Sequence, residues 1–194
     1  MGFKKFILLS FLCISSAFSQ SLEGYDLWLG HAKIQRPSLI EAYNDLASSV
    51  YFQDGTSTLK VAKQEMDTAL EKMLGRIPDF TNSINSDNTI IVSKGSFLPK
   101  AVVKSLQKDL QKIGNEGFVI KSVSHNEKDV LVVTANDDIG ILYGIFRLLH
   151  LIKTGQSLTG INWVDAPKID IRMLNHWDNL DRVRPGNLQP SYFQ

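Results

Sequence analysis

Segments with a helical period alternate with short β-branched runs along this chain, and this alternation limits the fold more than any other feature. Residues 56–74 predict the clearest helix, because their apolar side chains recur at steps of three and four residues. These side chains are Leu59, Ala62, Met66, Ala69, Leu70 and Met73. Thr56 or Ser57 can cap the start, and Gly75 follows the end, where a left-handed glycine is typical. We expect this stripe to pack into a core.

Two further helices are predicted later in the chain. Pro99 suits the first turn of one, which Gly114 ends, while Asn136 or Asp137 can cap the other, which Gly155 ends. The side chains expected to face inward are Val103, Leu106, Leu110 and Ile113 in the first, and Ile139, Leu142, Ile145, Phe146, Leu149 and Ile152 in the second. Both helices therefore have one apolar face to bury.

Gly140 and Gly144 lie four residues apart on the second of these helices. In a membrane helix this spacing would indicate dimerisation, but Arg147, His150 and Lys153 exclude a membrane span. We therefore predict that the two glycines allow the helix to pack closely on a sheet.

The fold expected from the remaining elements is α+β, a mixed β-sheet sandwich packed with about three helices. Its strands are predicted at residues 50–52, 89–92, 117–121, 130–135 and 161–164, with a short helix at 37–47 and a polar loop at 76–88. Hairpin and crossover connections both occur in this order, which favours a mixed sheet covered by helices. The hydrophobic content of 43% is enough for a real core.

Residues 1–19 have the pattern of a secretory signal peptide. Lys4 and Lys5 form a positive start, an apolar run follows, and Ala17-Phe18-Ser19 is a small-x-small cleavage site near Ser19-Gln20. The apolar run is shorter than the roughly 20 residues that a membrane helix needs. Cys13, the one cysteine of the chain, lies within this leader, so a mature protein would have no disulfide. We expect a secreted or periplasmic protein.

Composition and motifs exclude several classes of function. The formal net charge of +1 offers no patch for nucleic acid or an anionic membrane. No phosphate-binding glycine loop, nucleophile elbow or zinc-protease motif is present, so we expect no cofactor and no metal. His125 lies in a predicted hairpin loop at 125–129, without a second metal ligand at suitable spacing, and is expected to be solvated.

The stretch after Pro167 carries the most distinctive chemistry. Ile169, Ile171 and Met173 alternate as on one face of a strand. The pattern then changes to a polar and aromatic cluster that contains Asn175, His176, Trp177, Asp178, Asn179 and Asp181. A strand that ends in such a cluster is typical of a barrel strand that delivers side chains to a site. The alternative is that the polar residues only make turns and that the tryptophan is only core.

The run 172–181, Arg-Met-Leu-Asn-His-Trp-Asp-Asn-Leu-Asp, resembles the start of the catalytic barrel in glycoside hydrolase family 67, the xylan α-glucuronidases. Tyr-Asp-Leu-Trp-Leu at 25–29 and Gly-Ile-Leu-Tyr-Gly-Ile-Phe-Arg-Leu-Leu at 140–149 are similar to that family's N-terminal domain. Accessory domains of family 20 hexosaminidases carry a similar helix. The resemblance covers residues 22–181, and implies a hexosaminidase-like α+β domain followed by one orphan first barrel strand.

The resemblance implies an enzyme that removes 4-O-methylglucuronic acid from xylo-oligosaccharides by inversion. Inversion needs two carboxyl groups roughly 6.5–9.5 Å apart, and the resemblance places both on later barrel strands. We therefore assign no catalytic residue in this chain and expect it to be inactive alone. Asn175, His176, Trp177 and Asp178 are predicted to bind substrate. The implied partner is the xyloglucuronic oligosaccharide, and a homodimer of the full-length enzyme stays open.

The boundaries predicted on these grounds are a signal peptide at 1–19, the N-terminal α+β domain at 20–166, the start of the (β/α)8 barrel at 167–181 and a non-family tail at 182–194. The resemblance stops abruptly after Asp181, and the tail has no strand or helix period, which suggests a truncation or a frame error. Two other functions remain open. One is a free-standing carbohydrate-binding or adaptor domain, and the other is a small hydrolase that uses His176, Asp178 and Asp181.

Overall fold

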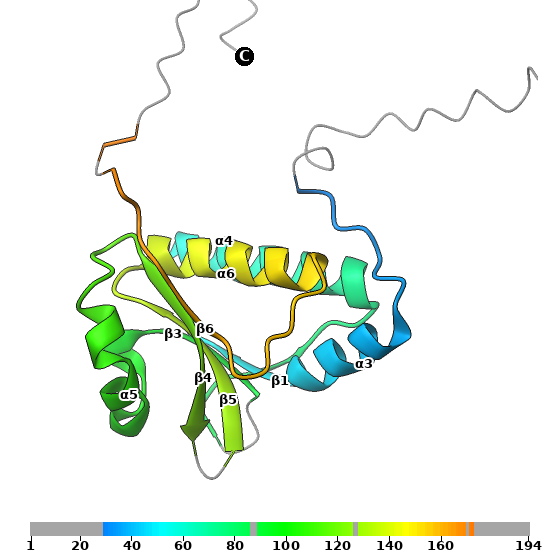
Figure 1. Ribbon diagram of the computed structural model, residues 1–194, viewed down its shortest axis with the longest axis horizontal. Coiled ribbons are helices and arrows are strands. Elements are labelled where there is room, and N and C mark those ends of the chain that lie inside the picture. Colours follow the sequence, from blue (N-terminus) through cyan, green and yellow to red (C-terminus); the bar gives the residue numbers. More distant parts are fainter. Residues whose placement is uncertain (1–28, 86–88, 126–127, 170, 173–194) are drawn as a thin grey trace, which may run out of the picture.

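A mixed six-stranded β-sheet with helices on both faces forms the body of the computed structural model, which describes residues 29–85, 89–125, 128–169 and 171–172 (Figure 1). The strands are β1 (Ser49–Phe52), β2 (Asp79–Thr81), β3 (Ile90–Lys94), β4 (Phe118–His125), β5 (Lys128–Ala135) and β6 (Asn162–Asp165). The helices are α3 (Pro37–Leu46), α4 (Ser57–Leu74), α5 (Lys100–Leu110) and α6 (Asp138–Lys153), with a 3₁₀ turn, η2 (Gly95–Phe97). The predicted α+β class is confirmed, with four α-helices in the described residues where about three were expected.

The strand order is β2-β1-β3-β5-β4-β6. The first four strands of this order pair in parallel, and β4 pairs antiparallel with both β5 and β6. A parallel neighbour needs a crossover, and α4 supplies it between β1 and β2. A hairpin joins β4 to β5. The mixture of connections expected from the sequence is therefore the one observed.

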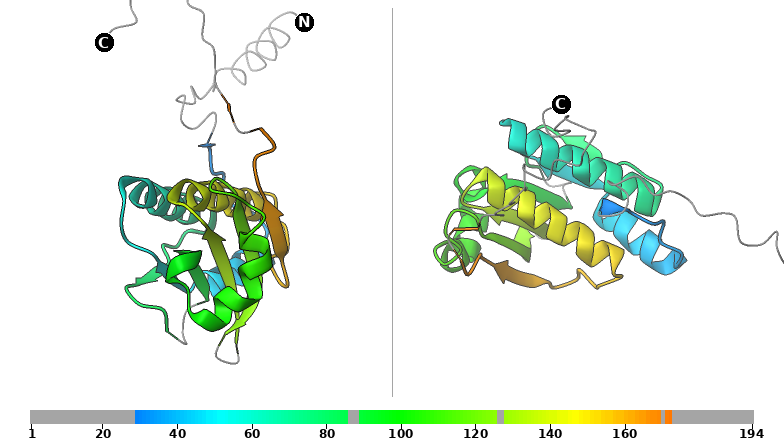
Figure 2. Two further views of the ribbon diagram at one scale, coloured as in Figure 1. Left: turned by 90° about the vertical axis from the view of Figure 1, so that its left-hand side faces the viewer. Right: turned by 90° about the horizontal axis from the view of Figure 1, so that it is seen from above.

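Two cores lie on opposite faces of the sheet. Figure 2 shows α4 and α6 side by side over one face, and α5 lies on the other. Alternate strand residues serve the two sides: Ile90 and Val92 join the core under α4 and α6, whereas Ile91 joins the core under α5. Because both faces are covered, the central strands are continuous β-branched runs rather than alternating ones.

The predictions for α4 are confirmed in detail. The hydroxyl of Thr56 accepts a hydrogen bond from the backbone N–H of Leu59 at 3.4 Å, and Gly75 adopts a left-handed φ of 77° after the last turn. All six residues of the predicted stripe are buried. Local capping and the apolar period therefore agree with the tertiary packing here.

The predicted inward faces of the other two long helices are partly wrong. In α5, Val102 is buried and Val103 is only half-buried. In α6 the buried face contains Gly140, Ile141, Gly144, Ile145, Leu148, Leu149, Leu151 and Ile152, whereas Ile139, Leu142 and Phe146 are only half-buried. The buried face of α6 is therefore rotated from the predicted one. The reason is that Gly140 and Gly144 are part of the buried face, whereas the prediction counted only large apolar side chains.

Close packing of the two glycines on the sheet is confirmed. A Cβ atom at Gly140 would lie 2.4 Å from the carbonyl oxygen of Gly117 and 2.7 Å from the Cβ of Ala135. At Gly144 it would lie 2.9 Å from a methyl group of Val133. Any larger residue would push α6 away from β4 and β5.

Two predicted segments differ from the structure. The predicted loop at 76–88 contains β2, an edge strand too short to show a period. The strand predicted over Ile169, Ile171 and Met173 is absent from residues 166–169 and 171–172, and the side chains of Ile169 and Ile171 are 65% and 75% exposed. Within the described part no strand pairs with the backbone of these residues. Met173 lies outside the described residues.

Candidate functional site

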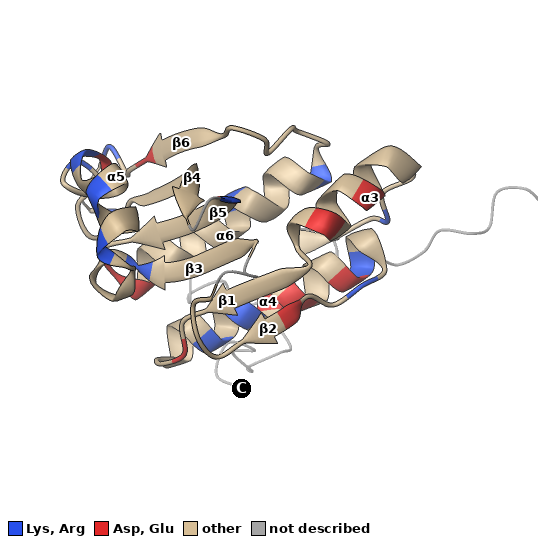
Figure 3. Cartoon of the chain, turned by 90° about the horizontal axis from the view of Figure 1, so that it is seen from below, with Lys and Arg blue, Asp and Glu red and all other residues tan. Residues whose placement is uncertain are grey.

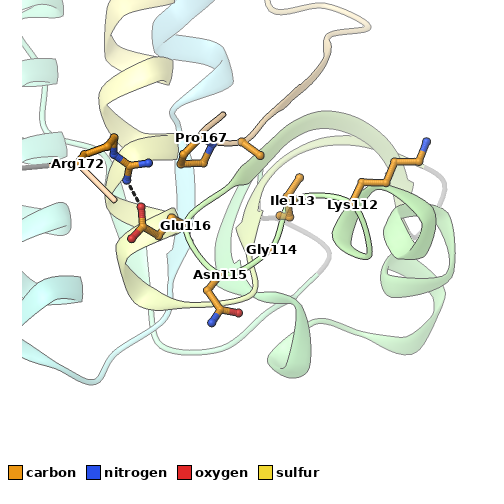
Figure 4. Close-up of a pocket in the computed structure, with 8 residues that line it drawn as sticks. Lys112, Ile113, Gly114, Asn115, Glu116, Pro167 and Arg172 are labelled. Carbon is orange, nitrogen blue, oxygen red and sulfur yellow. Dashed lines mark hydrogen bonds and ion pairs between the residues drawn. The ribbon is translucent and has the colours of Figure 1, made fainter. Parts of the chain in front are cut away.

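The junction where the chain leaves β6 is the described part that is nearest in sequence to the predicted substrate-binding residues. The turn 112–116, which follows α5, lies beside Ala166, Pro167 and Arg172, and together they line a cavity of about 510 Å³. Figure 4 shows the Arg172 guanidinium directed toward the Glu116 carboxylate across this space. The junction is therefore a contact between the end of one helix and the segment that leads out of the sheet.

Two features hold the turn in place. Gly114 has a left-handed φ of 60°, which reverses the chain after α5. The side-chain amide of Asn136 donates hydrogen bonds to the carbonyl oxygens of Leu110 at 2.9 Å and Gly114 at 2.7 Å. Asn136 was predicted as a candidate cap for α6, but it bonds the end of α5 instead. The residue whose side chain caps α6 is Asp137, through the N–H of Asp138.

Gly117 allows the end of β6 to lie against the same turn. A Cβ atom at this position would come within 2.3 Å of the carbonyl oxygen of Ile113 and 2.8 Å of that of Asp165. The register of the edge pair follows, with Phe118 opposite Asp165. The start of β4 thereby fixes where β6 stops and in which direction the chain leaves.

Arg172 ties the exit segment back to this turn. Its guanidinium forms an ion pair with Glu116 and donates a hydrogen bond to the carbonyl oxygen of Ile169 at 3.0 Å. Both charged side chains are partly exposed, so the pair is worth only about 0–1 kcal/mol. Such a contact sets direction rather than stability, and it performs no bond chemistry by itself.

The predicted site residues Asn175, His176, Trp177 and Asp178 lie outside the described residues, as does Asp181. The structure therefore neither brings them together nor separates them. Their roles stay predictions, and so do the signal peptide at 1–19 and the tail at 182–194. The last described residue, Arg172, stands three positions before Asn175.

A second polar cluster lies where β1, β3 and β5 end, and sequence reasoning missed it. The amine of Lys94 lies 2.8 Å from one carboxylate oxygen of Asp138, and the hydroxyl of Thr56 donates to the other at 2.8 Å. The Lys94 amine and the Thr56 hydroxyl, in that order, hold the pKa of Asp138 below its usual value. Buried Gln53 accepts from the backbone N–H of Lys94 at 2.9 Å and from the Ser93 hydroxyl.

Parallel strands often bind ligands at their carboxyl ends, which is why this cluster is a candidate site. Its described polar groups, however, bond one another and join the starts of α4 and α6. We interpret it as a structural brace. The signal that could have indicated it is the position of Gln53, Lys94 and Asp138 directly after three predicted strands.

Metal and histidine chemistry find no support in the described residues. No group of three or more His, Cys, Asp or Glu side chains there could hold a metal ion. His125 ends β4 and pairs with Lys128, so the predicted hairpin loop is shorter than expected. No helix within the described ranges is long and apolar enough to cross a membrane.

These features describe an α+β domain with an outgoing segment, and comparison with known proteins shows its family. Residues 27–148 match the family described as Glycosyl hydrolase family 67 N-terminus, which is more than half of the chain, and the chain belongs to this family. The predicted resemblance is thus confirmed over that range.

A curated relative adds a more particular likeness. The chain is 24% identical over 175 residues to Probable alpha-glucuronidase A of Aspergillus terreus (strain NIH 2624 / FGSC A1156). This match covers 88% of the chain and 20% of the relative, so the chain spans about a fifth of the length of that protein. Among solved structures, a GH138 enzyme targeting pectin rhamnogalacturonan II matches 63% of the chain and 15% of its own, with 19% identity and a TM-score of 0.41.

Proposed function

We propose that this chain is the non-catalytic N-terminal domain of a secreted α-glucuronidase that removes 4-O-methylglucuronic acid from xylo-oligosaccharides with inversion. The observation that carries the proposal is the family 67 match over residues 27–148, together with the name of the curated relative. The substrate and the inverting mechanism come from the family resemblance. The chain alone is expected to be inactive, because the carboxyl pair of the reaction belongs to the barrel.

The domain's own contribution is mechanical. Its two cores make a rigid platform, and the polypeptide leaves that platform after β6 at a point fixed by Gly117 and Asp165. The Glu116–Arg172 pair then directs the outgoing segment. In the whole enzyme this geometry would set the position of the first barrel strand relative to the sheet.

Four residues just beyond the described part are proposed to reach the substrate. Trp177 would stack on a sugar face, while Asn175, His176 and Asp178 would hydrogen-bond and position the ring. These roles follow from their place at the end of the first barrel strand in the resemblance. The alternative role, a core tryptophan among turn residues, predicts a loss of stability instead of a loss of turnover.

The free-standing carbohydrate-binding module is a weaker alternative. Such a module commonly presents several aromatic rings in one row. Among the described residues the well-exposed aromatic side chains are Phe97, 60% exposed on η2, and Tyr143, 38% exposed on α6. Two rings on separate elements do not make a row, and the residues of the small hydrolase, His176, Asp178 and Asp181, lie outside the described part.

Export, with cleavage near Ser19-Gln20, is part of the proposal. The proposal also includes a xyloglucuronic oligosaccharide as the substrate of the full-length enzyme. Whether that enzyme forms a homodimer stays an open question. No cofactor, nucleic acid or membrane partner is proposed. Mass spectrometry of the N-terminus after expression in a secreting host tests the leader, and a protein retained with Met1 intact would contradict it.

The substrate role is tested by Trp177→Ala in an enzyme that carries this domain together with its barrel. We expect kcat/KM on aldouronic acids to fall by about tenfold or more, because a stacking contact to the sugar is lost. Phe97→Ala, which removes an exposed ring on η2, is the control and should leave kcat/KM within about twofold. Unchanged turnover in Trp177→Ala would remove the proposed role.

A further inference from the structure

A groove formed by α6 and the start of β4 combines aromatic rings with a cation. Tyr143, Arg147 and His150 follow one another at steps of four and three along α6, which places them on one face of the helix. With Phe118 and Phe146 they line a hollow of about 300 Å³. Figure 2 shows β6 running along the side of α6, so the groove lies at the edge of the sheet. A hollow of this size is at the lower end of the range for small ligands.

The Arg147 guanidinium is held in place before any ligand arrives. It stacks over the ring of Trp163, with 4.9 Å between the guanidinium carbon and the ring centroid. One of its nitrogens also lies 3.7 Å from a carboxylate oxygen of Asp165. The side chain is only partly buried, so part of its planar face of donors reaches the groove. An arginine fixed by stacking loses little freedom when it binds a carboxylate.

The charges around the groove favour an acidic ligand. After Asp138, α6 carries no further Asp or Glu, and its Lys, Arg and His side chains are Arg147, His150 and Lys153. The Lys153 amine donates to the carbonyl oxygen of Gly30 at 2.6 Å, which leaves Arg147 and His150 as the groove's own basic groups. Asp165 is the carboxylate that Arg147 contacts, and its 3.7 Å separation is longer than a direct hydrogen bond.

We propose that this groove binds the carboxylate-bearing ring of a uronic acid in an oligosaccharide, as an accessory site of the domain. Arg147 would bind the carboxylate, His150 would contribute a further polar contact, and Tyr143 would stack on the sugar face. The choice of uronic acid among carboxylates rests on the proposed function. The site uses other residues than the predicted Asn175 to Asp178 and no pair of carboxyl groups, so it would retain substrate rather than cleave it.

Two other partners fit the observations less well. A protein surface of standard size buries about 800 Å² on each side, whereas this hollow is lined by five side chains and suits one ring. Non-specific attraction of a polyanion would instead use the exposed lysines at every fourth position of α5 and the turn after it, Lys100, Lys104, Lys108 and Lys112. Figure 3 shows blue segments on α5, which covers the opposite face of the sheet from α6. These alternatives become outcomes of the test.

The test is titration of the 194-residue chain with xylotriose carrying 4-O-methylglucuronic acid, compared with plain xylotriose, followed by amide NMR shifts. We expect shifts confined to α6, β6 and the start of β4, and about tenfold tighter binding of the acidic sugar. Arg147→Gln should remove this preference. Asp165→Asn should strengthen binding of the acidic sugar by about two- to fivefold, because the competing carboxylate is gone. Tyr143→Ala should weaken both sugars.

Matched controls distinguish binding in the groove from non-specific binding elsewhere on the surface. Phe97 is an exposed ring with the Lys94 amine 5.7 Å from its centroid, so Phe97→Ala removes a similar pair elsewhere. Phe97→Ala and Lys104→Gln should leave both affinities unchanged. Thermal unfolding checks that each variant is folded, and Arg147→Lys replaces Arg147→Gln if the latter is not.

Three results would overturn the site. They are equal binding of both sugars, loss of binding in Lys104→Gln, and absence of shifts at millimolar sugar. None of these results bears on whether an enzyme containing the barrel releases glucuronic acid, so failure of the groove and failure of the proposed function remain distinguishable.

Discussion

The sheet body and the segment that leaves it after β6 differ in how much of their apolar side-chain surface is buried. In the body, both faces of the central strands are covered, and residues such as Val50, Val92 and Val133 have no exposed surface. In the outgoing segment, Ile169 and Ile171 expose most of their side chains, and one partly exposed ion pair attaches it to the body. The contrast shows that the fold is determined by residues up to Asp165, while the apolar side chains that follow have no such cover within the described part.

The largest expected effect is a loss of stability of the sheet body. Gly140→Ala should lower the free energy of unfolding by about 2–3 kcal/mol, because the new methyl group would overlap the carbonyl oxygen of Gly117 and the side chain of Ala135. Chemical denaturation measures it. His150→Ala, at an exposed position of the same helix, should change stability by less than about 0.5 kcal/mol. A stable Gly140→Ala protein would mean that α6 is not clamped on the sheet.

An intermediate effect tests the brace at the strand ends. Asp138→Asn should cost about 1–2 kcal/mol at neutral pH, since the charged partner of Lys94 and Thr56 is lost at the start of α6. Asp129→Asn, on β5, is a control that keeps this cluster intact. Equal stability of the two variants would show that the cluster contributes nothing.

The same residue gives a pH dependence with a definite sign. The pKa of Asp138 is lower in the folded protein than the usual value, so its stabilising effect is present above about pH 4, the value for an unperturbed aspartate, and disappears as pH falls through the lowered pKa. The difference in unfolding free energy between wild type and Asp138→Asn should therefore shrink on acidification below about pH 4. A difference that grows in acid would contradict this assignment.

The smallest expected effect concerns the outgoing segment. Glu116→Gln should change global stability by less than about 0.5 kcal/mol, because its ion pair with Arg172 is partly exposed. Backbone ¹⁵N relaxation at Arg172 should nevertheless show motion of larger amplitude, since the pair holds that end of the segment. Relaxation that is unchanged there would mean that the pair does not direct the chain. Glu41→Gln, on α3, serves as the control.

The sequence predictions were most accurate where local signals, such as caps and apolar periods, determine the structure, and least accurate where tertiary packing does. α4 was predicted almost to the residue, because Thr56, its apolar stripe and Gly75 are local signals that the packing does not override. The buried face of α6 was predicted with a rotation, because only the sheet reveals that Gly140 and Gly144 pack inward. β2 was missed since a three-residue edge strand takes its conformation from β1 rather than from its own sequence.

The candidate sites divide in the same way. The family resemblance named the position of Asn175, His176, Trp177 and Asp178, which the described structure does not reach. The other candidate contacts could be identified only from the proximity of their residues in the structure. The contact of Glu116 with Arg172 joins residues that are 56 positions apart, and the contact of Arg147 with Trp163 joins two different elements. Neither contact could be predicted from a periodic pattern in the sequence.

The central claim is that this domain supports glycoside hydrolysis without performing it. The most direct measurement is release of 4-O-methylglucuronic acid from aldouronic acids by the purified 194-residue chain, followed by chromatography. The account predicts no release above the background without enzyme. Release at an enzyme-like rate, lost on replacing His176, Asp178 or Asp181, would contradict it and make the chain a hydrolase in its own right.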